Sequence, residues 1–212
     1  MKTKAMLVMM MPALFFGCTV LSFYPLYTED TLIRDDRISG KWYTTDNTTD
    51  TIIWDISVPE NIQANLTYAF AVGADEAIPN SYAYTLNMYN QHEPETAAEF
   101  ILHLVKLGDQ VFVDFFPIDW EEIFDNTLLV FHLMGVHTFA KIEFGEQITI
   151  NWFDAELMQT LFNENRIRVR HENNGVYTLL TAKPDELQKF VQKYAGEKSA
   201  FSEDLLFQLS KY

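Results

Sequence analysis

Residues 138–153 read TFAKIEFGEQITINWF, with hydrophobic and polar side chains alternating on either side of Gly145. This period of two is typical of strands with one buried face. If the loop at Gly145 has an odd number of residues, five apolar side chains share one face of the hairpin: Ala140, Ile142, Ile148, Ile150 and Trp152. The polar residues 141, 143, 149 and 151 share the other face. A slip of one residue would mix the two sets, so this register is preferred.

Strand patterns recur along the chain, at 40–43, 51–57, 67–72, 81–89, 97–107 and 111–116. Gly108-Asp109 predicts a two-residue hairpin loop, and Asn174-Gly175 predicts another. The second loop would place Ile167 and Val169 beside Leu180 and Ala182. About ten short strands joined by tight turns indicate a mainly β (α+β) domain, built as a closed or strongly curved antiparallel meander.

Two or three helices are expected toward the C-terminus. Asp154 is a suitable N-cap for a helix with Leu157, Met158, Leu161 and Phe162 on one stripe. Pro184 suits the first position of a second helix, whose apolar stripe is Leu187, Phe190, Val191 and Tyr194. Ser202 is a candidate cap for a last short helix that carries Leu205, Leu206 and Leu209.

Composition excludes several classes of protein. The 212 residues include 30 acidic and 15 basic side chains, a formal net charge of −15, which argues against nucleic acid as a partner. One cysteine excludes a disulfide framework. The chain has no nucleophile motif, no glycine-rich phosphate loop and no metal-binding motif. We therefore expect no cofactor and no metal site. An enzyme that uses His103 and Asp114 as its acid and base is the third hypothesis, behind two non-catalytic ones.

The N-terminus has the features of a lipoprotein signal. Lys2 and Lys4 precede an apolar run over 5–16 that is too short to span a bilayer, and Gly17-Cys18 follows. The end of the run resembles a bacterial lipobox, in which the cysteine carries palmitate-type acyl chains. The alternatives are an ordinary secretory signal or a membrane helix with a chance cysteine. Cleavage before Cys18 would bring the net charge to −17, so lipid, not basic residues, would hold the protein to the membrane.

Several segments together resemble a family of uncharacterised bacterial lipoproteins from Bacteroidetes- and Planctomycetes-like organisms. They are residues 24–29 (YPLYTE), the Gly40-x-Trp42 pattern, 103–117 (HLVKLGDQVFVDFFP), 136–139 (VHTF) and 179–188 (LLTAKPDELQ). The resemblance covers most of the chain and implies an envelope location and a lipocalin-like β-barrel with helical additions. It implies no activity. The expected organisation is a signal peptide over 1–17, a lipid-anchored tether over 18–37 and one β-rich domain over 38–212.

Two groups of polar residues are candidate sites. A two-residue loop at 108–109 places His103 opposite Asp114 among apolar neighbours, either as a polar pair in a ligand cavity or as a structural pair that sets the register. Alternation over 166–170 places Arg166, Arg168 and Arg170 on one side, to contact an anion or a partner or to balance nearby acids. His132 and His137, and the acids of 46–50 and 114–125, match no metal-binding pattern.

These observations predict an envelope lipoprotein, anchored to the membrane through lipid on Cys18 and facing the periplasm from the outer membrane. The leading hypothesis is a non-catalytic, lipocalin-like module that binds a small apolar or amphiphilic ligand. The alternative is an assembly protein with a filled core that contacts another envelope protein. The two differ in whether the barrel encloses a cavity.

Overall fold

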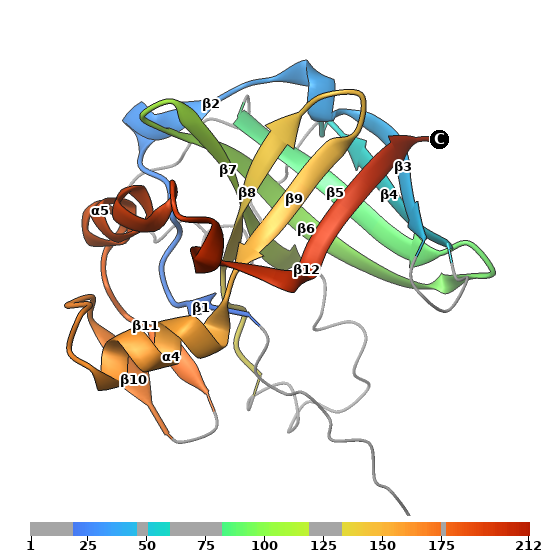
Figure 1. Ribbon diagram of the computed structural model, residues 1–212. Coiled ribbons are helices and arrows are strands. Elements are labelled where there is room, and N and C mark those ends of the chain that lie inside the picture. The colour runs from blue at the N-terminus through green and yellow to red at the C-terminus, as the bar shows by residue number, and fades with distance from the viewer. Residues whose placement is uncertain (1–18, 46–50, 60–81, 119–132, 175–176) are drawn as a thin grey trace, which may run out of the picture.

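The computed structural model describes residues 19–45, 51–59, 82–118, 133–174 and 177–212. Eight antiparallel strands close into a barrel, because β12 pairs with both β9 and β3 (Figure 1). The strands in barrel order are β3 (Gly40–Thr45), β4 (Thr51–Ser57), β5 (Ala83–Asn90), β6 (Glu93–Leu107), β7 (Gln110–Ile118), β8 (Thr138–Phe144), β9 (Ile148–Phe153) and β12 (Phe201–Lys211). The predicted antiparallel, lipocalin-like barrel with added helices is confirmed.

Two hairpins have the predicted registers. Ala140 lies opposite Trp152 and Phe144 opposite Ile148, so the β8–β9 loop has three residues and the apolar set faces one side. Leu107 lies opposite Gln110, which leaves Gly108 and Asp109 as a two-residue loop. Gly108 adopts a φ of +64°, a conformation that costs glycine little and other residues more.

The strands bury side chains on both of their faces. One set fills the barrel interior and includes Trp54, Leu104, Val113, Ile142 and Leu209. The other set, which includes Phe112, Phe139 and Phe153, forms an outer layer beneath the N-terminal segment and two helices. Figure 1 shows both helices on the same side of the barrel. The aromatic residues are thus divided between a barrel core and an outer core.

The two α-helices of the described residues begin where their caps predict. Helix α4 (Ala155–Asn163) follows Asp154, whose Oδ1 accepts the Leu157 N–H at 2.7 Å, and it buries Met158, Leu161 and Phe162. Helix α5 (Pro184–Tyr194) begins at its proline and buries the four residues of its predicted stripe. The described residues also form three short 3-10 turns, at Glu29–Thr31, Asp36–Ile38 and Lys198–Ala200.

The predicted third helix is wrong: the segment forms β12. Ser202 does act locally like a cap, because its Oγ accepts the N–H groups of Asp204 and Leu205 at 3.2 Å. The bonds occur within an irregularity of the β9–β12 register, after which Phe207 and Leu209 alternate into the barrel. A strand prevails over a helix here because β3 and β9 would otherwise keep unpaired backbone groups along their edges.

The segment predicted as a tether is largely packed on the barrel. β1 (Leu21–Ser22) joins a small sheet with β11 (Thr178–Leu180) and β10 (His171–Asn173), and β2 (Leu32–Ile33) pairs with β6. Leu26, Tyr27 and Leu32 are buried, whereas Phe23 is exposed.

The β10–β11 loop differs from the predicted one. Asn173 pairs with Thr178, so the loop contains the four residues 174–177 and not two. The Asn174 side chain accepts the Tyr177 N–H at 2.8 Å across it. A shift of two residues preserves sidedness, and Ile167, Val169, Leu180 and Ala182 are all buried as expected.

Some predictions concern residues outside the described ranges. They are the signal peptide with Cys18, the strand at 67–72, the acidic residues of 46–50, His132, and the acidic residues of 119–125.

Candidate functional site: an aromatic cavity in the barrel

A cavity of about 310 Å³ occupies one end of the barrel and is partly open. Ten described residues line it, nine of them from seven of the barrel strands: Thr19, Trp54, Leu86, Met88, Phe100, Phe115, Thr138, Trp152, Leu205 and Phe207. None of the ten carries a charge. An eight-stranded barrel encloses just enough space for filling side chains or one small ligand, and here part of that space is left open.

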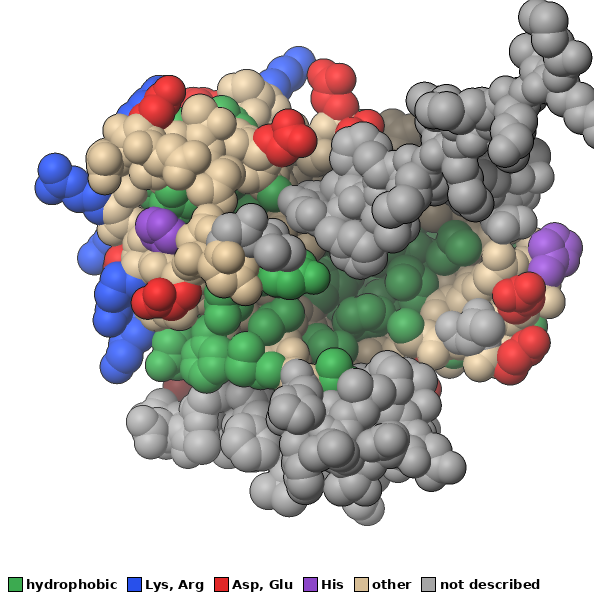
Figure 2. All heavy atoms as spheres, turned by 90° about the horizontal axis from the view of Figure 1, so that it is seen from below, with side chains coloured by type: hydrophobic (Ala, Val, Ile, Leu, Met, Phe, Trp, Pro, Cys, Tyr) green, Lys and Arg blue, Asp and Glu red, His purple; other side chains and the backbone are tan. Residues whose placement is uncertain are grey.

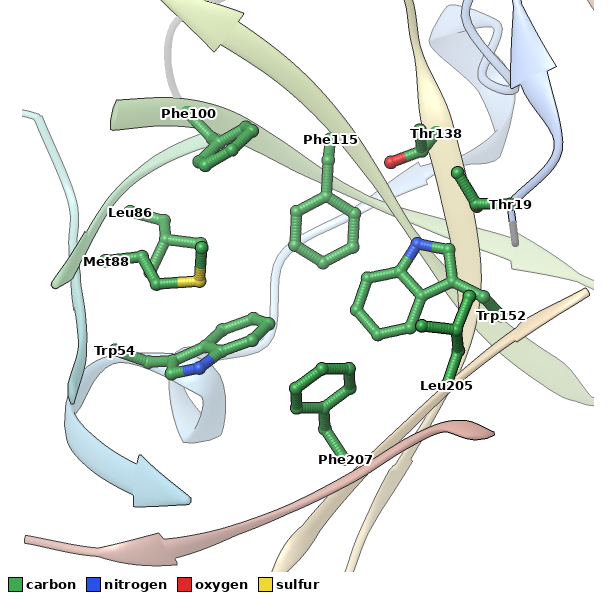
Figure 3. A pocket seen from close by; sticks show the side chains of 10 residues that line it. All are labelled: Thr19, Trp54, Leu86, Met88, Phe100, Phe115, Thr138, Trp152, Leu205 and Phe207. Carbon is green, nitrogen blue, oxygen red and sulfur yellow. The ribbon is translucent and has the colours of Figure 1, made fainter. Parts of the chain in front are cut away.

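Four aromatic rings surround the cavity in a continuous circuit (Figure 3). Ring centroids are separated by 6.2 Å between Trp54 and Phe115, 5.3 Å between Phe115 and Trp152, 5.4 Å between Trp152 and Phe207, and 5.8 Å between Phe207 and Trp54. Each ring is fixed by two neighbours at distances typical of favourable aromatic pairs. The walls are therefore preorganised for an apolar ligand.

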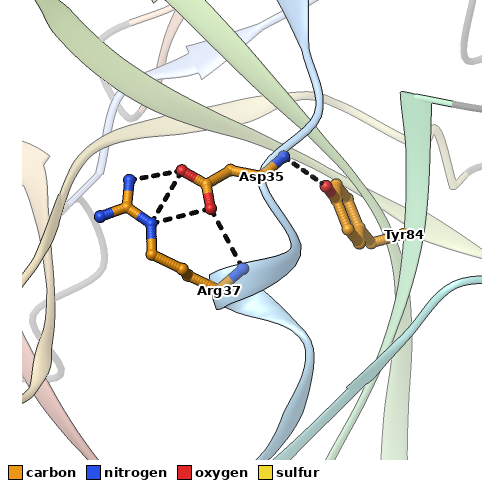
Figure 4. A network of polar contacts seen from close by, with 3 residues as sticks. All are labelled: Asp35, Arg37 and Tyr84. Carbon is orange, nitrogen blue, oxygen red and sulfur yellow. Dashed lines mark hydrogen bonds and ion pairs between the residues drawn. The ribbon is translucent and has the colours of Figure 1, made fainter.

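The opposite end of the barrel is closed. Ile38 is fully buried there, and its carbonyl accepts the indole N–H of Trp42 at 2.8 Å. The Asp35 N–H donates to the hydroxyl of buried Tyr84 at 2.9 Å, and the Asp35 carboxylate accepts from Arg37 (Figure 4). Hydrogen bonding by Arg37 lowers the pKa of Asp35, and burial raises the pKa of Tyr84. Among the described residues this end is covered, and the cavity lies toward the other end, where Thr19 and Thr138 line it.

Asp114 lies in the outer layer, between the barrel wall and the N-terminal segment. It is opposite His103 in the β6–β7 register, as predicted, and both side chains are 1% exposed. The carboxylate bonds elsewhere: Oδ2 accepts the Leu26 N–H at 2.8 Å, and Oδ1 lies 2.7 Å from His137 Nδ1. Asp114 thus joins the N-terminal segment to β8, while the register alone suggested His103 as its partner.

His103 packs against an aromatic ring instead of a carboxylate. Its ring centroid lies 4.3 Å from that of Tyr27, and its Nε2 is buried without a hydrogen bond among the described residues. Burial, together with the nearby His137, lowers the pKa of His103 to about 3. Neither His103 nor Asp114 lines the barrel cavity. Strand parity explains this, because odd residues of β6 and even residues of β7 face outward.

The arginine segment keeps the predicted alternation without strand pairing. Ile167 and Val169 are buried, and the three arginines are exposed. Arg166 pairs with Glu164 at 3.3 Å and Arg170 with Glu186 at 3.1 Å. Such exposed pairs contribute little to stability.

Sequence reasoning did not single out most of the cavity residues. Alternation along β9 placed Trp152 on the apolar face of its hairpin, but Met88, Phe100 and Phe207 had no distinguishing pattern. Seven strands bring these side chains together. The sequence could have identified them only as the set of inward-facing residues that lie at one level of a closed barrel.

No group of three or more His, Cys, Asp or Glu among the described residues is arranged to hold a metal ion. None of the helices in the described ranges has the length and hydrophobicity needed to cross a membrane. Comparisons with family models, curated proteins and solved structures found no match. The site therefore has to be interpreted from its own geometry.

Proposed function

We propose that the protein is a membrane-anchored envelope lipoprotein whose barrel binds one small apolar or amphiphilic ligand without chemical turnover. The observation that carries this proposal is the uncharged, aromatic-walled cavity of about 310 Å³. Ligand sites are typically concave, mostly apolar and 300–1,000 Å³ in volume, so this cavity is at the small end of the range. An assembly protein with a completely filled core does not account for it.

Ligand binding can be tested with two neighbouring substitutions on β12. Leu205 lines the cavity, whereas Leu206 is 44% exposed on the outer face. The mature protein is purified from membranes, denatured and extracted, and the extract is analysed by mass spectrometry. We expect a stoichiometric small amphiphile in the wild type and in Leu206→Trp, and its loss in Leu205→Trp, whose indole fills the cavity. Equal recovery from both variants, or no ligand in the wild type, would refute binding in the barrel.

The anchor is tested separately with Cys18→Ala. The proposal predicts metabolic labelling of the wild type by radioactive palmitate and no labelling of the variant. Labelling of the variant would place the acyl group on another residue and contradict the lipobox interpretation.

A further inference from the structure

The start of the described chain forms part of the cavity wall. Thr19 lines the cavity together with Thr138, and the bridge between Ser22 and His137 holds residues 19–22 beside the beginning of β8. The residue before Thr19 in the sequence is Cys18. A lipid on Cys18 would therefore bring the open end of the barrel to the membrane surface.

Exposed apolar side chains accompany this end. Phe23 is 46% exposed, Leu133 36% and Met134 55%, and these residues adjoin the two segments joined by the Ser22–His137 bridge. Figure 2 shows hydrophobic side chains gathered around a hollow on the face seen from below, with charged groups toward its periphery. A contiguous apolar surface beside an anchor is suited to contact with lipid.

The polar groups of the cavity restrict the head group of an amphiphile. The Thr138 hydroxyl turns toward the side of Phe115 (Figure 3). Thr19 Oγ1 and the indole nitrogen of Trp54 are both buried without a hydrogen-bond partner among the described residues. Two hydroxyl groups can bond to an alcohol or an ester. They cannot neutralise a carboxylate, which is costly to bury unpaired, and a chain of net charge −15 repels anions as well.

We infer that the cavity takes the tail of an uncharged, single-chain lipid, such as a monoacylglycerol, from the membrane to which the protein is anchored. The head group is held near Thr19 and Thr138. This inference rests on the proposed function and adds the chemical class and the source of the ligand. The cavity, at the small end of the range for ligand sites, is suited to one chain and not to a two-chain phospholipid.

The test uses the acylated protein in phosphatidylcholine vesicles at pH 8. Two photoreactive probes have the same diazirine-bearing sixteen-carbon tail, and one is a glycerol ester whereas the other is the free carboxylate. After irradiation, mass spectrometry counts adducts on cavity residues. We expect the glycerol ester to label the cavity at least tenfold more than the carboxylate. Thr138→Val, which keeps the side-chain shape, should lower ester labelling roughly threefold to tenfold, the value of one neutral hydrogen bond.

Failure of this inference and failure of the proposed binding function would give different results. Equal or stronger labelling by the carboxylate, or no effect of Thr138→Val, would overturn the head-group assignment. If the ester labels the cavity as fast when supplied in separate vesicles as in the protein's own, the membrane source is wrong. If neither probe labels the cavity and Leu205→Trp changes nothing, the proposed binding function itself fails.

Discussion

Replacing Asp114 should separate the N-terminal segment from the barrel. In Asp114→Ala the Leu26 N–H and His137 Nδ1 both lose a buried partner, at 2.8 and 2.7 Å respectively. A buried hydrogen-bonding group left without its partner costs about 1–3 kcal/mol, and this substitution leaves two such groups. We expect a loss of about 4 kcal/mol, a large part of the typical 5–15 kcal/mol stability of a domain.

The assay is urea unfolding of the purified protein in mild detergent, followed by tryptophan fluorescence. Asp154→Ala is the matched control, because it removes one hydrogen bond from an aspartate to a backbone N–H and should cost about 1 kcal/mol. Hydrogen exchange at the Leu26 amide should accelerate only in the Asp114 variant. A cost no greater than that of the control, with unchanged exchange at Leu26, would refute the role assigned to this carboxylate.

Three further predictions follow from single residues. Because its pKa is about 3, His103 stays neutral in the folded protein down to that pH, whereas in the unfolded chain it gains a proton near pH 6.5. Its contribution to stability is therefore constant above pH 6.5 and falls below it, by about 2 kcal/mol at pH 5. His103→Phe should remove that part of the pH dependence in urea titrations at pH 5 and 8, and an identical dependence in both proteins would contradict the neutral assignment. Gly108→Ala should lower the free energy of unfolding by about 1–2 kcal/mol, measured by thermal unfolding, because Gly108 has a positive φ. Gly145→Ala is the control and should be nearly neutral, so equal effects of the two substitutions would show that φ is not the cause. Ser202→Ala removes two long hydrogen bonds at the β12 irregularity and should cost about 1 kcal/mol, with faster amide exchange at Asp204 and Leu205; unchanged exchange would argue against their role.

Local patterns predicted those parts of the fold that depend on neighbours in the chain. The alternation over 138–153 was sufficient to predict the register of the β8–β9 hairpin, because one face of that hairpin is buried. Asp154 and Pro184 marked the beginnings of two helices. Alternation over 166–170 likewise predicted that Arg166, Arg168 and Arg170 lie together outside the core. Lipid attachment at Cys18 remains a prediction from sequence.

Tertiary structure determined the rest, because it depends on partners distant in the chain. Residues 201–211 carry a helix-like cap and yet form a strand, since β3 and β9 supply backbone partners that a sequence window does not contain. Asp114 bonds to Leu26 and His137, 88 and 23 residues away, and not to the histidine opposite it. Whether the aromatic residues fill the barrel or line a cavity depends on the combined volume of the inward side chains from seven strands, compared with the volume that the barrel encloses. Only the tertiary structure shows that Ile38 is buried at one end of the barrel and that Thr19 lines the cavity toward the other.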